Sequence, residues 1–174
     1  MGLAEDLGYQ HSNPGPVRRR VRQLFSSPAG STLARVTLRP LDALVRRLSG
    51  DRVTITRAFS GLATLWLTTT GAKSGLPREV PLIGIPCGTG IAVLGTYYGH
   101  EATPAWVYNL EADPDASLSF GGRTILVRAR PATEQEEGGV WEAAARIYPG
   151  YAGYRQRAAH RKIRVLVLEM RESP

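Results

Sequence analysis

Three tyrosines recur every third residue in the segment YPGYAGY, at Tyr148, Tyr151 and Tyr154. Phenol rings offer flat apolar faces, and their hydroxyls can donate or accept hydrogen bonds. Because proline and glycine disfavour a helix interior, we predict that this segment forms a flexible turn. Two interpretations remain open for the rings. They pack between a helix and the sheet, or they form the wall of a substrate pocket.

A second group of reactive residue types lies in the segment TTTGAKSGLPR, residues 68–78, which we expect between two strands. Its glycines allow close approach of the backbone, while its hydroxyls and amides donate hydrogen bonds and Lys73 and Arg78 add positive charge. These properties suit an anion. A charged β-turn with no ligand is the alternative. The segment is not a P-loop, because its glycine and lysine are not adjacent and no helix is expected after it.

Other chemistries find little support in the residue pattern. The three histidines, His11, His100 and His160, lack metal-ligand spacing. Cys87 has no evident base partner, and no nucleophile elbow of the form G-x-S-x-G is present. No G-x-G-x-x-G follows a strand, which argues against a Rossmann nicotinamide site. We therefore predict no metal site and no triad.

The elements expected to position these residues are mostly strands. Runs rich in β-branched and apolar residues, bounded by Gly and Pro, predict strands at residues 64–70, 79–86, 91–97, 116–131 and 162–169. Gly121 and Gly122 suit the tight turn of a hairpin within 116–131. The segment 80–100 carries no charged residue, yet its prolines and glycines break it repeatedly, so we interpret it as two strands and not a membrane span.

Two helices are expected among the strands. One begins at Thr103-Pro104, a cap followed by proline at the first helical position. The other begins at a capping box formed by Thr133 and Glu136. Many short antiparallel strands with few helices predict a mainly β fold of the α+β class, organised as a small barrel or curled sheet.

The N-terminal part of the chain is strongly basic. The 174 residues carry a net charge of +7, and ten arginines but two acids lie within residues 16–57. We predict a basic helical arm over 1–50 and a cofactor-binding domain over 51–174. The arm has three interpretations: a solvated helical arm, a peripheral anchor to anionic lipid, or a nucleic-acid contact, for which no binding motif is found. A single cysteine and no apolar leader predict a cytoplasmic protein.

Three segments together resemble the deazaflavin-dependent nitroreductase family, whose members are split β-barrels that use coenzyme F420. They are TTTGAKSGLPR, PAWVYNLEADPDASL and YPGYAGY, in the family's order and near its spacing. The resemblance extends over about residues 62–169. It implies an FMN-binding-like split β-barrel with antiparallel strands.

The resemblance also implies a role for each motif. Lys73, Ser74 and Arg78 match positions that hold the phosphate and glutamate tail of F420. The positions that line the deazaflavin ring correspond to Pro81, Leu82, Leu94, Gly95, Thr96, Tyr97, Trp106 and Asn109. Tyr148, Tyr151 and Tyr154 match substrate-pocket tyrosines, and Tyr151 is also expected near the cofactor.

The chain departs from the family pattern at three positions. Ala72 replaces an arginine that contributes to phosphate binding, Tyr97 replaces a lysine or asparagine, and Ile83 replaces an aromatic residue. We expect an F420-dependent reductase that passes hydride to a hydrophobic quinone, enone or nitroaromatic acceptor, and that forms a homodimer. The alternative is a carrier that binds F420, flavin or haem without turnover.

Overall fold

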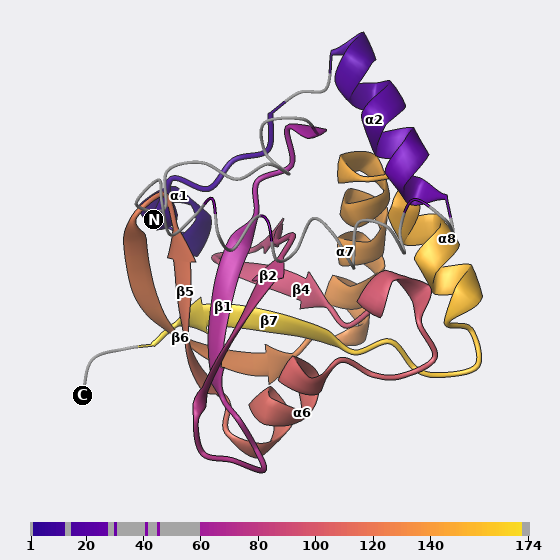
Figure 1. Cartoon of the computed structure of the whole chain (residues 1–174). Coiled ribbons are helices and arrows are strands. Elements are labelled where there is room, and N and C mark those ends of the chain that lie inside the picture. Colours follow the sequence, from indigo (N-terminus) through magenta and orange to yellow (C-terminus); the bar gives the residue numbers. More distant parts are fainter. Residues whose placement is uncertain are drawn as a thin grey trace.

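The computed structural model describes residues 2–12, 15–27, 30, 41, 45 and 60–171. Within them the chain forms one antiparallel sheet of seven strands in the order β2-β1-β5-β6-β7-β4-β3. The strands are β1 (Leu65–Thr70), β2 (Pro77–Leu82), β3 (Ile85–Cys87), β4 (Gly90–Leu94), β5 (Asp115–Phe120), β6 (Arg123–Pro131) and β7 (Val165–Met170). The sheet curls into a half-barrel (Figure 1), which confirms the expected fold class.

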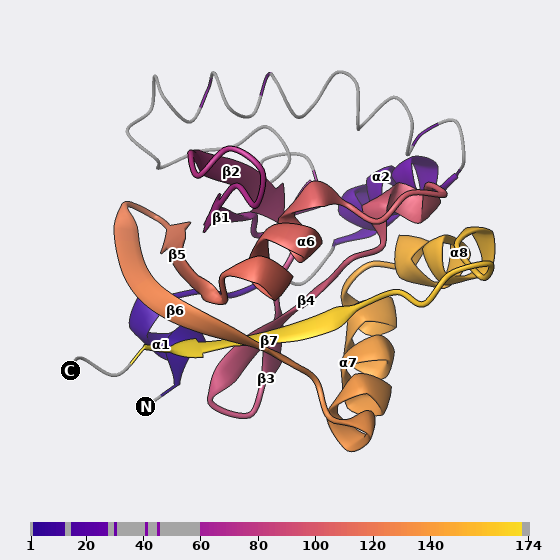
Figure 2. The same cartoon turned by 90° about the horizontal axis from the view of Figure 1, so that it is seen from below.

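Helices cover both faces of this sheet. They are α1 (Leu3–Leu7), α2 (Pro16–Ser26), α6 (Ala105–Ala112), α7 (Glu134–Ile147) and α8 (Gly150–Arg157), with a 3-10 turn η2 (Tyr97–Gly99). Figure 2 shows α6 and α7 on opposite sides of β4 and β7. Helices α2, α7 and α8 gather at one end, where α8 contacts both of the others (Figure 1). No helix of the described ranges is long and apolar enough to cross a bilayer.

The arrangement of the helices explains the almost continuous apolar sequences of β4 and β7. Successive side chains of a strand point to opposite faces. Ile91 and Val93 of β4 accordingly belong to one core cluster, which includes Trp106 of α6. Ala92 and Leu94 belong to a second, which includes Trp141 of α7. Both faces are therefore buried.

Two local predictions are confirmed by the backbone. Gly121 and Gly122 adopt φ angles of 59° and 82° in the turn between β5 and β6. This left-handed region favours glycine. The Thr133 hydroxyl accepts a hydrogen bond from the Glu136 backbone N–H, and the Glu136 carboxylate accepts one from the Thr133 N–H. This reciprocal capping starts α7 at the predicted residue.

The strand predicted over 79–86 is divided into β2 and β3, and the interruption has a physical cause. The Gly84 N–H donates to the Tyr9 hydroxyl at 2.9 Å instead of to a neighbouring strand. A Cβ at position 84 would also lie 2.6 Å from Cγ2 of Ile91. The N-terminal segment therefore occupies the place that a continuous strand would need.

Two element ends differ from the predictions by a few residues. The strand predicted over 91–97 ends at Leu94, because the backbone turns into the left-handed region at Tyr97 and Tyr98. Pro104 occupies the N-cap of α6, so Thr103 does not cap the helix with its side chain. Residues 31–50 of the predicted helical arm lie outside the described residues, apart from positions 41 and 45.

The described N-terminal residues contribute to the core. Leu3, Leu7 and Tyr9 are each no more than 2% exposed and belong to the same apolar cluster as β1 and β4. The division at residue 50 stays a prediction.

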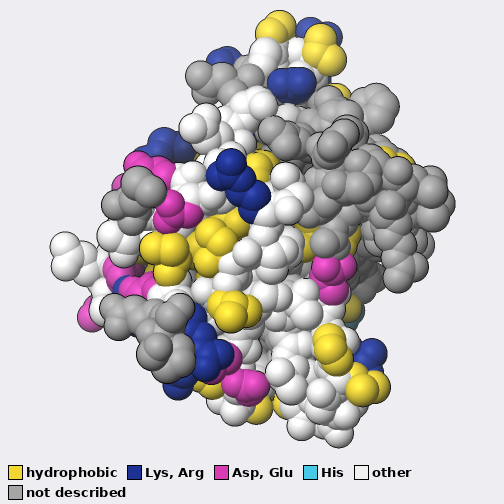
Figure 3. All heavy atoms as spheres, turned by 90° about the vertical axis from the view of Figure 1, so that its left-hand side faces the viewer, with side chains coloured by type: hydrophobic (Ala, Val, Ile, Leu, Met, Phe, Trp, Pro, Cys, Tyr) yellow, Lys and Arg dark blue, Asp and Glu magenta, His cyan; other side chains and the backbone are white. Residues whose placement is uncertain are grey.

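On the face shown in Figure 3, basic and acidic side chains are mixed with apolar ones. Asp115 of β5 pairs with Arg128 and Arg171.

Candidate active site

The loop between β1 and β2 is held in a fixed shape by its own backbone. The Gly71 N–H donates to the Leu76 carbonyl at 2.9 Å, and the Ser74 and Gly75 N–H groups donate to the Gly71 carbonyl at 3.0 and 2.7 Å. A Cβ at Gly71 would lie 2.6 Å from the Ser74 Oγ, so a side chain does not fit there. This tight turn presents Lys73 and Ser74 at the surface of a cavity.

Asn109 of α6 connects this loop to the rest of the site. Its side chain is 93% buried, its Nδ2 donates to the Thr69 hydroxyl at 2.9 Å, and its Oδ1 accepts from the Ala72 N–H at 3.0 Å. Because both ends of the amide are used, Asn109 fixes β1 and the loop relative to α6. The residue predicted to line a cofactor thus also has a structural role.

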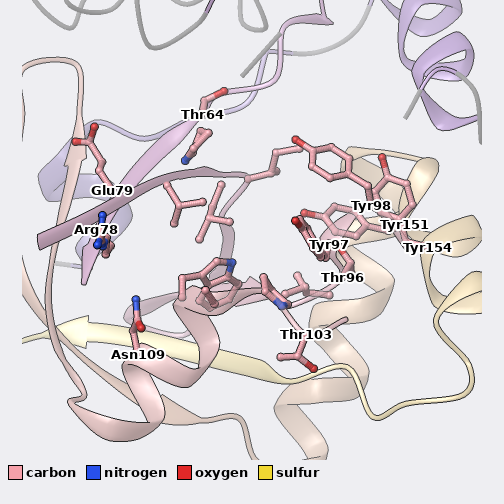
Figure 4. Close-up of a pocket in the computed structure, with 18 of the residues that line it drawn as sticks. Thr64, Arg78, Glu79, Thr96, Tyr97, Tyr98, Thr103, Asn109, Tyr151 and Tyr154 are labelled. Atoms are coloured by element: carbon pink, nitrogen blue, oxygen red, sulfur yellow. The ribbon is translucent and has the colours of Figure 1, made fainter. Parts of the chain in front are cut away.

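The cavity that the loop borders has a volume of about 1060 Å³. Every predicted site residue except Gly95 borders it. Lys73, Ser74 and Arg78 contribute the charged end, the middle is largely apolar, and the tyrosines contribute the other end. The middle is lined, among others, by Val80, Pro81, Leu82, Ile83, Leu94, Ala105 and Trp106. Figure 4 shows Arg78 and Glu79 on one side and the tyrosines on the other.

Gly95 lies behind the cavity wall. Its carbonyl accepts from Nη2 of Arg161 at 3.1 Å, and a Cβ there would lie 3.0 Å from Cγ2 of Val107 and 3.4 Å from the Arg164 carbonyl oxygen. Position 95 thus affects the site by allowing β4 and α6 to pack closely, since its atoms do not border the cavity.

The turn after Gly95 has an unusual backbone. Tyr97 and Tyr98 have φ angles of 48° and 58°, a left-handed conformation that costs side-chain-bearing residues about 1–2 kcal/mol each. Two arginines, one at the end of α8 and one after it, stabilise this turn by hydrogen bonds to its carbonyls. Arg161 donates to the Thr96 carbonyl, and Arg157 donates to the Tyr98 carbonyl at 3.3 Å. The strain therefore places both tyrosine rings at the cavity.

The three tyrosines of YPGYAGY form a compact cluster. Tyr148, Tyr151 and Tyr154 are each at most 5% exposed, and their ring centroids lie 5.9 Å apart in all three pairs. Burial raises the pKa of each phenol above its ordinary value, so the hydroxyls stay protonated at neutral pH. Tyr98 adds a fourth ring against Tyr154. The three rings pack in the core and also border the cavity, while their role as the wall of a substrate pocket stays a prediction.

The prediction of a flexible turn for this segment was wrong. Residues 150–157 form α8, and Pro149 occupies its N-cap position, where proline needs no hydrogen-bond partner for its nitrogen. Gly150 is required by packing, because a Cβ there would lie 2.6 Å from Cζ of Tyr148. Gly150 therefore permits a helix in close contact with the Tyr148 ring.

Sequence reasoning missed one wall of the cavity. Val21, Arg22 and Leu24 of α2 border it, together with Ser60, Leu62 and Thr64 from the segment before β1. The spacing of Val21 and Leu24 puts them on one face of a helix, and this apolar face was the available signal. The arginines that surround it suggested a solvated arm instead.

The donor set fits a long organic ligand with one anionic end. The loop end carries the Ser74 hydroxyl and the charged residues Lys73, Arg78 and Glu79, apolar surfaces line the middle, and uncharged phenols lie at the far end; Arg22 of α2 borders the cavity as well. The described part of the chain contains no group of three or more His, Cys, Asp or Glu side chains placed to bind a metal. Coenzyme F420, with its acidic tail and flat tricyclic ring, matches this distribution.

Comparison with known proteins points to the same cofactor. Residues 37–170 match the family model described as F420H(2)-dependent quinone reductase. The F420H(2)-dependent quinone reductase Rv1261c of Mycobacterium tuberculosis is 30% identical over 111 residues, which cover 62% of this chain and 74% of the relative.

Two solved structures are similar to the chain as well. One, described as an F420-H2 dependent reductase, FDR-A, is 32% identical, with a TM-score of 0.56 over 62% of this chain and 94% of that one. The other, described as a domain-swapped dimer, is 27% identical, with a TM-score of 0.58 over 82% of this chain and 100% of that one.

Proposed function

Because the chain belongs to the F420H(2)-dependent quinone reductase family, we propose that the cavity of about 1060 Å³ binds both reduced coenzyme F420 and a hydrophobic quinone. Membership makes it an oxidoreductase whose cofactor is F420 and whose reaction is hydride transfer to a quinone, as we expected from the sequence. The observation that carries the proposal is the location of the cationic loop and the buried phenols on the same cavity.

In this proposal the loop binds the acidic end of the cofactor. Lys73 and Arg78 are exposed, and Nη2 of Arg78 lies 3.4 Å from Oγ of Ser74, so charge and hydroxyl donors converge at the cavity rim. Ala72 has no side-chain donor, and its backbone N–H already donates to Asn109, so it contributes no hydrogen bond to the ligand. Each charge-assisted hydrogen bond to phosphate or carboxylate contributes about 1.5–3 kcal/mol.

The apolar middle of the cavity would hold the flat ring. Pro81 and Leu82 of β2, Leu94 of β4 and Trp106 of α6 offer surfaces against which a tricycle packs. Thr96 and Tyr97 border the same region from the strained turn. When bound, the reduced cofactor supplies a hydride, and hence two electrons, to the acceptor. The protein would hold the ring and orient the acceptor beside it.

The phenol cluster would hold the acceptor. Tyr151 is buried against Trp141, Tyr148 and Tyr154, so its ring is fixed before any ligand binds. The phenols present apolar faces to an aromatic acceptor and remain uncharged hydrogen-bond donors at neutral pH. Enones and nitroaromatics share these features, and we propose them as further acceptors.

Three finer features also stay proposals. A homodimer is supported by the similar structure described as a domain-swapped dimer. A peripheral contact with anionic lipid would use α2, whose Arg19 and Arg20 are exposed beside Val17, which is 73% exposed. A cytoplasmic location rests on the sequence arguments given above.

The proposed function is tested by a titration followed by a turnover assay. F420 and FMN are titrated separately against the purified protein, with cofactor fluorescence as the signal. Oxidation of reduced F420 by menadione is then measured. We expect F420 to bind more tightly than FMN and menadione to be reduced. FMN binding without F420 binding would contradict the cofactor assignment, and tight F420 binding without turnover on several acceptors would indicate a carrier.

A further inference from the structure

Arg22 is a buried cation on the wall of the cavity. The residue is 4% exposed. Its guanidinium donates hydrogen bonds to the backbone carbonyls of Ser60 at 2.8 Å, Ile147 at 2.8 Å and Ser12 at 3.2 Å. No carboxylate of the described residues pairs with it. Among the described residues, three of its five N–H donors have a partner and two do not. A buried guanidinium without an acidic partner favours negative charge nearby.

Thr64 lies on the same cavity and has an unused hydroxyl. The residue is 8% exposed, and its Oγ1 is buried with no hydrogen-bond partner among the described residues. Figure 4 shows Thr64 between Arg78 and Glu79 on one side and the tyrosines on the other. Rotation about χ1 exchanges the hydroxyl with the methyl group, and no existing hydrogen bond is lost in that rotation. A buried polar group without a partner is costly, so a ligand oxygen that met it would be favoured.

The two residues flank one short segment. Arg22 binds the carbonyl of Ser60 at the start of residues 60–64, and Thr64 ends that segment. Nδ1 of His11 accepts from the N–H of Ala63, which precedes Thr64. Both residues border the same cavity, so one ligand can contact the charge and the hydroxyl together.

We propose that Arg22 and Thr64 form a subsite for the acceptor's oxygen atom, and that this subsite selects acceptors that become oxyanions on reduction. This inference rests on the proposed function and names the acceptor class. Hydride addition to a quinone forms a bond to hydrogen and moves an electron pair onto the carbonyl oxygen, while the reduced cofactor is oxidised. The resulting oxyanion then takes a proton from water. A cation and a hydroxyl at that oxygen favour the charged product.

The Thr64 contribution is tested by binding, without turnover. Menadione is titrated by calorimetry into protein saturated with oxidised F420, for the wild type, Thr64→Val and Thr64→Ser. We expect Thr64→Val to weaken binding roughly tenfold, because it removes one hydrogen bond, and Thr64→Ser to remain within about threefold of the wild type. Thr64→Val should not lower the melting temperature, since the hydroxyl that it removes has no partner. Equal binding by all three proteins would overturn this part, as would no detectable menadione binding.

The Arg22 contribution is tested by the preference for a charged ligand. The anion of 2-hydroxy-1,4-naphthoquinone mimics the oxyanion, and menadione is its neutral counterpart. Arg22→Lys and Arg22→Met both lose the three carbonyl contacts and should both lower the melting temperature. We expect Arg22→Met alone to reduce the affinity ratio of anion to menadione, by at least about tenfold, while Arg22→Lys keeps most of it. Partial unfolding of a variant lowers its apparent affinity for both ligands by the same factor, so it cancels in the ratio.

The outcomes separate this inference from the proposed function. If the wild type oxidises reduced F420 with menadione but the affinity ratio is the same in Arg22→Lys and Arg22→Met, the subsite is wrong and the function stands. If the wild type binds F420 and fails to reduce any quinone, the proposed function is wrong, whatever the affinity ratio.

Discussion

The phenol oxygens of Tyr148 and Tyr154 lie 3.2 Å apart within a cluster that the surrounding helices bury. Tyr148 precedes α8 and Tyr154 lies on its second turn, so this contact connects the end of α7 to α8 at the wall of the cavity. The contact has two functions, because it satisfies two buried hydroxyls and fixes the orientation of the rings that face the proposed acceptor.

Replacement of one member of this pair should affect both stability and acceptor binding. We expect Tyr154→Phe to lower the free energy of unfolding by about 1 kcal/mol, since one buried hydrogen bond is lost. The KM for menadione should rise several-fold. Urea denaturation and steady-state kinetics measure the two effects. Tyr108→Phe changes a half-exposed phenol and should alter stability by less than about 0.5 kcal/mol. Similar stabilities of the two variants would argue against the pair.

A single methyl group at Gly150 should disturb the same cluster. Its Cβ would lie 2.6 Å from Cζ and 2.8 Å from the hydroxyl oxygen of Tyr148. We expect Gly150→Ala to lower the free energy of unfolding by about 1–3 kcal/mol through overpacking. Gly138→Ala is the matched control, because that helical position in α7 is open, and it should stabilise the protein by about 0.5–1 kcal/mol. Opposite signs in urea denaturation are the expected result.

The two hydrogen bonds that the Asn109 side chain makes to β1 and the loop predict a link between the stability of the protein and its affinity for the cofactor. Asn109→Leu removes the bonds to both Thr69 and Ala72, and we expect a loss of about 2 kcal/mol in stability and weaker F420 binding. Thr69→Val removes the bond from Asn109 and a 3.4 Å bond to the Arg78 carbonyl but leaves the loop amide bound, so it should cost about 1 kcal/mol with F420 affinity near that of the wild type. Unchanged F420 affinity in Asn109→Leu would show that the loop binds the cofactor without the hydrogen bonds of Asn109.

His11 predicts a loss of stability in mild acid. Burial lowers its pKa, and its two ring nitrogens are already engaged: Nδ1 accepts from Ala63, and Nε2 donates to the Gly84 carbonyl at 2.9 Å. As the pH falls, a histidine whose pKa is lower in the native state takes up its proton in the unfolded state before it does so in the native state. The free energy of unfolding should therefore decrease as the pH falls below about 6.5.

The measurement compares urea denaturation at pH 7.5 and pH 5.5 for three proteins. His11→Gln lacks the titrating ring and should lose less stability between the two pH values than the wild type. His160→Gln changes an exposed ring and should follow the wild type. If His11→Gln and the wild type lose equal stability, another group is responsible.

The parts of the fold that the sequence predicted correctly depend on local signals. The capping box at Thr133 and the Gly121-Gly122 turn each fix an element end through neighbouring residues. The interruption at Gly84 depends on Tyr9, which is 75 residues away in the chain, so no local pattern announced it. The same holds for α8, where Gly150 serves ring packing and not chain flexibility.

The site was predicted where motifs and resemblance agreed. The loop, the apolar lining and the phenols do border one cavity, whereas Gly95 supports it from behind. Arg22 was missed because a run of arginines on a helix usually indicates a solvated face, and its burial depends on carbonyls at positions 12, 60 and 147. Thr64 was missed because nothing in its sequence surroundings shows that its hydroxyl lacks a partner.

The most direct test of the account is the dissociation constant of F420 for Lys73→Ala and Arg78→Ala, measured by cofactor fluorescence at low and moderate salt. We expect each variant to bind at least about tenfold more weakly than the wild type, with a smaller salt dependence, because a charge-assisted contact to the acidic tail is lost. Lys162→Ala, an exposed lysine that does not border the cavity, should bind normally. Wild-type affinity and salt dependence in both loop variants would contradict the account.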